Sequence, residues 1–121
     1  MKYALLIYGP EVSQEDIDPA EAQQVMAEYA AFSERITTRD INKGGEALHE
    51  TASATTVRVR DGETLATDGP FAETKEALGG FYLVDVADLD EAIEVAAQIP
   101  GARTGSVEIR PVWVWENDYE G

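Results

Sequence analysis

Two segments of the chain are apolar on both of the alternating faces that a β-strand presents. Residues 2–8 read KYALLIY and residues 80–86 read GFYLVDV. Strands with this pattern must be covered on both sides of their sheet. The chain has only two stretches with the spacing of an amphipathic helix, and two helices cover one face of a four-stranded sheet. Something apolar must therefore cover the second face, and another copy of the same chain is the simplest candidate.

The first helix is predicted from its cap and its periodicity. Asp18 precedes Pro19 and Glu21, which gives a capping residue, a proline at the first helical position and an acid in the first turn. This start predicts a helix over residues 20–39 that ends at residues 42–45. Its apolar residues recur at intervals of three and four and form one stripe, namely Ala22, Val25, Met26, Tyr29, Phe32 and Ile36.

A second helix and four further strands complete the pattern. Asp88 and Glu91 repeat the capping signature, and the apolar stripe that follows consists of Leu89, Ala92, Ile93 and Ala96. Alternation predicts further strands over residues 46–50, 55–60, 63–67 and 107–115. Asp61-Gly62 is the two-residue signal for a type I′ turn, so two of these strands form a hairpin.

The order of these elements predicts the fold class. A strand, a helix and a strand come first, the hairpin is inserted, and a strand, a helix and a strand follow, which is the α+β ferredoxin-like arrangement of a split βαβ unit. At 121 residues and 44% hydrophobic content, the chain is long enough for one domain. We expect that domain over residues 1–115, with a loose tail over residues 116–121, and a homodimer with the sheets face to face.

Composition narrows the classes of function. There are 24 acids against nine bases, a net charge of −15, and this repels nucleic acid and anionic membrane surfaces. The absence of cysteine fits a reducing compartment, and the apolar run at the start is too short for a signal peptide or a membrane span. A soluble cytoplasmic protein is expected. One histidine and no cysteine give no transition-metal site, and no motif indicates a cofactor.

The segment at residues 68–76, DGPFAETKE, is longer than a turn requires. Asp68 cannot accept the usual hydrogen bond from the residue two positions on, because Pro70 has no N–H. Its carboxylate would instead cap a short helical turn over residues 72–77, or pair with Lys75. The capping role is structural and is the one that the residue types favour. The alternative is that Asp68 is an acid or orienting group in a catalytic site.

Four more side chains are candidates for a site near this segment. Phe71 would plug the loop onto the core or wall a pocket. His49, the only histidine, would be a general base or an ordinary surface residue. Lys75 and Arg110 would hold an anionic ligand, or make ion pairs of little energetic weight. The acids that would pair with the basic residues of this region, Arg58 and Arg60 included, are Glu73, Glu76 and Glu108.

The motifs taken in order resemble a known family. They are the opening MKYALLIYG, the hairpin TTVRVRDG, the signature TDGPFAETKEALGGFYLVDVADLDEA and, near the end, GSVEIRPV. Over nearly the whole chain they resemble the DGPF branch of the YCII-related family of small bacterial proteins. The resemblance implies a ferredoxin-like protomer that pairs into a dimeric α+β barrel, with a cleft between the sheet and the helices.

The resemblance also bears on function. In the wider family, a histidine on the first helix and an aspartate after the second strand form a proposed catalytic pair, and one relative dechlorinates a chlorinated hydroxyquinol. Here residues 20–39 contain no histidine, so Asp68 stands at the position of the acid without that partner. Some DGPF genes adjoin or fuse with extracytoplasmic-function sigma factors, which implies a regulatory role.

Three functions are consistent with these observations. The leading hypothesis is a dimer that binds a small anionic molecule at residues 68–76, with a cofactor-free acid–base activity carried by Asp68 or His49. The alternative is a ligand-sensing or regulatory module without catalysis, linked to extracytoplasmic-function sigma factors. In the third, the signature segment is a folding element and holds no site.

Overall fold

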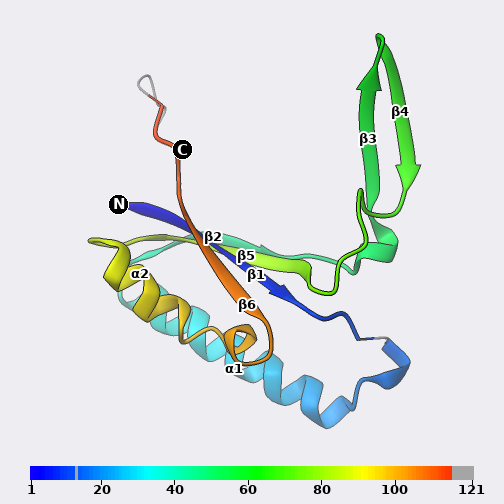
Figure 1. Ribbon diagram of the computed structural model, residues 1–121. Coiled ribbons are helices and arrows are strands. Elements are labelled where there is room, and N and C mark those ends of the chain that lie inside the picture. Colours follow the sequence, from blue (N-terminus) through cyan, green and yellow to red (C-terminus); the bar gives the residue numbers. More distant parts are fainter. Residues whose placement is uncertain (13, 116–121) are drawn as a thin grey trace.

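A computed structural model describes residues 1–12 and 14–115, and Figure 1 shows a sheet with both α-helices on one face. The elements are β1 (Lys2–Gly9), η1 (Gln14–Asp16), α1 (Pro19–Thr38), β2 (Asn42–Ala47), η2 (Thr51–Ser53), β3 (Thr55–Arg60), β4 (Glu63–Asp68), β5 (Ala77–Asp85), α2 (Leu89–Ala96), η3 (Pro100–Arg103) and β6 (Ser106–Pro111). The predicted tail, residues 116–121, lies outside the described residues. No helix in the described part of the chain is long and apolar enough to cross a membrane.

The main sheet has the strand order β2-β5-β1-β6, and all its pairs are antiparallel. The two strands that are apolar on both faces, β1 and β5, are therefore the central pair. The remaining strands, β3 and β4, form a separate two-stranded sheet. This topology confirms the predicted α+β ferredoxin-like fold with an inserted hairpin.

Both predicted helix caps are present. The Asp18 side chain accepts a hydrogen bond from the Ala20 N–H at 3.0 Å, and the Asp88 side chain accepts one from the Glu91 N–H at 2.9 Å. Each carboxylate satisfies an N–H that has no partner within its own helix. The first helix ends at Thr38, before the predicted stop.

The strand that follows α1 was predicted four residues too late. Gly44 and Gly45 were interpreted as the end of the helix, but they belong to β2, with φ of 134° and 156°. A Cβ on Gly45 would lie 2.5 Å from the Phe81 carbonyl oxygen, so glycine is needed where β2 approaches β5. As a result Leu48 and His49 lie beyond the end of β2, and the predicted alternation of residues 46–50 is wrong.

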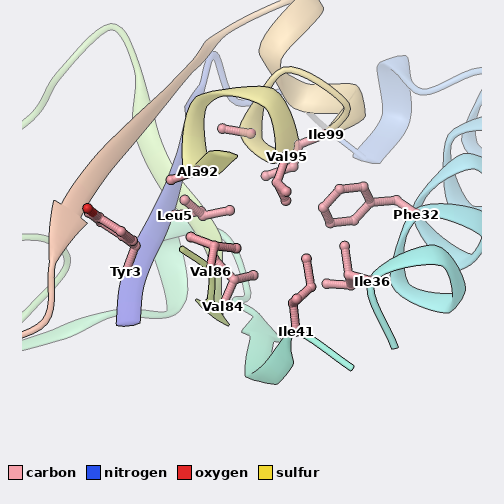
Figure 2. Close-up of a cluster of buried hydrophobic side chains, with 11 residues drawn as sticks. Tyr3, Leu5, Phe32, Ile36, Ile41, Val84, Val86, Ala92, Val95 and Ile99 are labelled. Atoms are coloured by element: carbon pink, nitrogen blue, oxygen red, sulfur yellow. The ribbon is translucent and has the colours of Figure 1, made fainter. Parts of the chain in front are cut away.

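The buried core lies wholly between the sheet and the helices (Figure 2). It consists of Tyr3, Leu5, Phe32, Ile36, Ile41, Val84, Val86, Ala92, Val95, Ala96 and Ile99. The helical stripes were predicted only in part, because Val25 and Met26 of α1 are exposed and only its C-terminal half reaches the core. Leu89 and Ile93 of α2 are also exposed, and Val95 takes a core position that the stripe did not include.

The face of the sheet away from the helices is apolar at its centre. The register places Ala4 opposite Leu83 and Leu6 opposite Phe81, on the side opposite to Tyr3 and Leu5. All four side chains are partly exposed in the single chain. We call these four residues, Ala4, Leu6, Phe81 and Leu83, the open face. The two-sided apolar pattern in the sequence thus corresponds to one buried and one uncovered face.

The inserted hairpin, β3–β4, stands apart from the main sheet and rises on the side opposite the helices (Figure 1). Its turn residues have φ of 51° at Asp61 and 78° at Gly62, which confirms the predicted type I′ turn. Val57 pairs with Ala66 and shares one face with Val59, as the alternation predicted. The hairpin is more exposed than expected, since every β4 residue is exposed.

Candidate functional site

A pocket of about 370 Å³ lies between α1 and the adjoining end of the sheet. Its lining is mainly apolar and consists of Ile7, Tyr29, Ser33, Gly45, Glu46, Ala47, Gly79, Gly80, Phe81 and Tyr82. The register puts Gly45 and Ala47 of β2, and Gly80 of β5, on the side that faces the helices. Because these residues have little or no side chain, the space between strand and helix stays empty. We call this space the helix–sheet pocket.

The glycines of the pocket floor are required by the backbone itself. A Cβ on Gly80 would lie 2.7 Å from the Glu46 carbonyl oxygen, and Gly45 is constrained in the same way by Phe81. Real Cβ atoms do not approach backbone oxygens this closely. The missing Cβ atoms of Gly45 and Gly80 therefore both allow β2 to approach β5 and leave the floor of the pocket open.

Three hydroxyl groups lie on the walls of this pocket. Tyr29 and Ser33 are four residues apart on α1 and therefore share a face of the helix. The Ser33 and Tyr82 hydroxyl oxygens are hydrogen-bonded at 3.0 Å, and the Tyr29 hydroxyl accepts a hydrogen bond from the Gly101 N–H at 3.1 Å. An apolar cavity with a few convergent polar groups is the usual form of a small-molecule site.

The Tyr29 hydroxyl has a raised pKa. Burial is the main cause, because it disfavours the tyrosinate, and nearby Tyr82 adds to the effect, while the Gly101 N–H and Arg103 oppose it. Tyr29 therefore keeps its proton at neutral pH and can donate a hydrogen bond to a ligand. It cannot act there as a general base.

This raised pKa predicts a loss of stability in alkali. Above the ordinary tyrosine pKa of about 10, the unfolded chain loses the Tyr29 proton while the folded chain retains it, so stability falls as pH rises through that window. Tyr29→Phe removes this contribution. Urea unfolding of both proteins from pH 7 upward should show the native protein losing stability relative to the variant above that pKa. A gap that stays constant with pH would contradict the assignment.

A second hollow of about 380 Å³ lies beneath the signature segment. It is lined by Pro10, Glu11, Thr51, Pro70, Ala72, Glu73, Thr74, Lys75 and Ala77. The Glu11 carboxylate closes one side by accepting hydrogen bonds from the Thr51 N–H at 3.1 Å and from its hydroxyl at 3.2 Å. We call this space the loop hollow. Its walls are more polar and more exposed than those of the helix–sheet pocket.

The signature segment itself differs from the prediction. Asp68 is the last residue of β4 and lies opposite Thr55, and residues 69–76 form no helical turn. The predicted cap is therefore wrong, and the Asp68 carboxylate makes no hydrogen bond within the described residues. The segment is instead held by the Gly69 N–H, which donates to the Ala54 carbonyl at 2.7 Å, and by the Thr56 hydroxyl, which donates to the Gly69 carbonyl at 2.8 Å.

The other predicted site residues are dispersed. Phe71 is 78% exposed, so it does not plug the loop onto the core of the single chain. Lys75 lines the loop hollow, and Arg110 donates to Glu108 of its own strand at 3.2 Å. His49 is exposed, two residues beyond β2. Within the described residues, no hydrogen bond or ion pair joins any two of the five predicted side chains.

The sequence did not single out the hydroxyls of the helix–sheet pocket. Tyr29 had been assigned to the apolar stripe, and Ser33 and Tyr82 carry no motif. The available signal was the four-residue spacing of Tyr29 and Ser33, together with the paired glycines at 44–45 and 79–80. The sequence pattern favours a helix end at Gly44 and Gly45 and a strand start at Gly80, whereas all four glycines lie within β2 and β5.

The sequence similarity to known proteins covers every described helix and strand. A protein of Rhizobium meliloti (strain 1021), named "Uncharacterized protein R00369", is 39% identical over 118 residues, which cover 96% of this chain and 95% of that protein. The YCII-related domain matches residues 1–116. That range includes every helix and strand described above. The chain therefore belongs to the YCII-related domain family.

Proposed function

We propose that the protein binds a small neutral molecule in the helix–sheet pocket, as a ligand-sensing module. The observation that carries this proposal is the set of hydroxyls from Tyr29, Ser33 and Tyr82 on the wall of a mainly apolar cavity of about 370 Å³, in which Glu46 is the one charged lining residue among those described. Apolar walls supply affinity for a ring or short chain, and the hydroxyls orient one polar group on it. A phenol or an aryl ketone has this chemistry.

Neutral ligands fit the pocket better than the anion expected from the sequence. No lysine or arginine lines the helix–sheet pocket among the described residues, and the net charge of −15 disfavours an approaching anion. Lys75 belongs to the loop hollow, and Arg110 is engaged by Glu108. The two cations chosen to hold an anion therefore contribute nothing to this cavity.

Binding accounts for the site better than acid–base catalysis does. A general base must be able to take a proton near the operating pH, and the raised pKa of Tyr29 moves it away from that range. Neither Asp68 nor His49 lines the helix–sheet pocket. The fixed hydroxyls instead suit recognition, which supports the sensing alternative. The link to a sigma factor rests only on the sequence resemblance to the DGPF branch.

A pair of matched variants tests where the ligand binds. Ala47→Leu adds the same side chain to the helix–sheet pocket that Ala72→Leu adds to the loop hollow. Phenol and acetophenone serve as probes, with binding followed by NMR chemical shifts. We expect Ala47→Leu to weaken binding at least about tenfold, or about 1.4 kcal/mol, because it fills the cavity, and Ala72→Leu to leave binding unchanged. Loss of binding in Ala72→Leu alone, or no binding to the native protein, would refute the proposed pocket.

We also propose that the protein is a homodimer in which the open faces of two copies meet. Ala4 and Leu6 of β1, with Phe81 and Leu83 of β5, form a contiguous apolar centre that neither helix reaches. A second copy offers the same surface, so a two-fold axis through this face would make a self-complementary contact. The flanking strand β6 contributes Glu108 and Arg110, which would form a polar rim.

A further inference from the structure

Two segments project from the sheet on the side of the open face. One is the hairpin β3–β4, and the other is the stretch at residues 112–115, which we call the C-terminal arm (Figure 1). The arm begins as a continuation of the edge strand β6, because the Val112 N–H donates to the Lys2 carbonyl at 2.9 Å. Any copy that covers the open face must lie between these two projections.

The C-terminal arm exposes large apolar side chains. Trp113 is 74% exposed, Val114 73% and Trp115 62%, and the two indole rings lie 5.8 Å apart. Contiguous exposed apolar groups of this kind mark interaction sites on soluble proteins. Tryptophan is also among the residues that contribute most to binding at protein interfaces. The arm therefore has the chemistry of a segment that is buried against another chain.

The hairpin exposes a complementary surface. Val57 and Val59 are 60% and 59% exposed and share one face with Ala66. An isolated two-stranded hairpin is at best marginally stable in water. The bonds of Gly69 with Ala54 and Thr56 close its base, and within the described residues no hydrogen bond joins β3 or β4 to the main sheet. A surface of β-branched side chains is well suited to pack against aromatic rings. We call Val57, Val59 and Ala66 the valine face.

We propose that in the homodimer the valine face of each copy packs on the C-terminal arm of the other. Within one copy the hairpin and the arm rise at separate ends of the structure, so they cannot meet (Figure 1). Consider a two-fold axis that lies between the two sheets and runs perpendicular to the line from hairpin to arm. This axis places the hairpin of each copy beside the arm of the other. An axis along that line would instead set hairpin on hairpin and arm on arm, and the valine face would then have no aromatic side chain against it. This inference rests on the proposed homodimer.

The cationic side chains of the hairpin lie on the face that does not meet the partner. Arg58 and Arg60 lie on the hairpin face opposite to the valines, and neither has a carboxylate partner among the described residues; Arg60 donates only to the Val59 carbonyl of its own strand, at 3.0 Å. The chain as a whole carries a net charge of −15. With the valine face against the partner, both arginines point away from it and stay in water, so the contact buries no cation.

The tryptophans allow a direct test, because the chain has only two and both are in the arm. Fluorescence excited at a wavelength that tyrosine does not absorb therefore reports on the arm alone. In the native dimer we expect blue-shifted emission and weak quenching by acrylamide. The double variant Val57→Lys, Val59→Lys should shift the emission to the red and increase quenching several-fold. The control Leu65→Lys, Thr67→Lys adds the same charge to the opposite face of the hairpin and should leave the signal unchanged.

Sedimentation of the same samples separates the possible failures. A native dimer whose tryptophans are quenched as strongly as those of the valine variant would overturn the contact and leave the homodimer intact. A native monomer at every concentration would overturn the homodimer, and the contact with it. Equal effects of the two double variants would show that the response is not specific to the valine face, which also overturns the proposal.

Cross-linking tests the arrangement without a charge substitution. The native chain has no cysteine, so Val59→Cys and Trp115→Cys can each be prepared alone and mixed with a bismaleimide. We expect a covalent heterodimer from the mixture and little covalent dimer from Val59→Cys alone. Efficient cross-linking of Val59→Cys to itself would show hairpin against hairpin, and the proposed contact would then be wrong.

Discussion

Replacing Gly105 with alanine is expected to destabilise the fold by about 3 kcal/mol or more, since the added Cβ has no space and no flexible neighbour. Its position would overlap the Tyr8 carbonyl oxygen and lie 2.9 Å from the Gly9 Cα. Both obstacles are backbone atoms of β1. The strand β6 begins at the next residue and pairs Ser106 with Tyr8. To admit a methyl group, β1 and β6 must separate where their pairing begins.

The neighbouring glycine provides a matched control. A Cβ on Gly9 would have nothing within 4 Å, and Gly9 has no positive φ, so Gly9→Ala should cost less than about 1 kcal/mol. Urea unfolding of the two variants measures the difference in the free energy of unfolding. Equal stabilities would mean that β1 and the start of β6 are not as close as described.

The parts of the fold that the sequence predicted are those that local chemistry determines. Asp18 and Asp88 each cap a helix through an N–H two or three residues away. Asp61 and Gly62 adopt the positive φ values that a type I′ turn requires. The two central strands were recognised because a short apolar run on both faces is a property of the segment itself. None of these features depends on which distant segment packs against them.

The errors at β2 have a common physical cause. The strand is defined by close backbone pairing with β5, a segment distant in the sequence. Gly44 and Gly45 look like a helix stop, and only their pairing with β5 shows that they are strand residues. Because the side chains of a strand alternate, the pairing with β5 also decides the face on which each β2 residue lies. Ala47, opposite Gly80, therefore lies on the helix side and lines the helix–sheet pocket.

The candidate site was harder to predict than the fold, because it is made of residues that share no motif. Tyr29 and Ser33 come from α1, Tyr82 from β5, and the cavity between them exists because Gly80 has no side chain there. Their meeting depends on strand register and on how α1 crosses the sheet. The conspicuous signature, by contrast, borders a more polar hollow, to which only Lys75 of the predicted site residues contributes.

Leu6→Lys is expected to convert the proposed homodimer into a folded monomer. Leu6 lies on the open face, opposite Phe81 on one side and Glu108 on the other, so it occupies the middle of the surface that two copies would share. A two-fold contact would bury two lysines at once, and each buried unpaired ammonium costs several kcal/mol. We expect the dissociation constant to rise by at least about 100-fold. In the single chain the position is partly exposed, so the folded protomer should tolerate the ammonium.

A control must add the same charge to an exposed apolar position outside the open face. Met26 of α1 is 71% exposed and lies on the helical layer, so Met26→Lys should leave the dimer intact. Sedimentation over a range of concentrations gives the oligomeric state, and far-UV circular dichroism shows whether each variant is folded. If Leu6→Lys stays dimeric, or if Met26→Lys dissociates equally, the copies do not meet through the open face. The apolar residues that β1 and β5 carry on that side would then need a different partner, since two helices cannot cover both faces of this sheet.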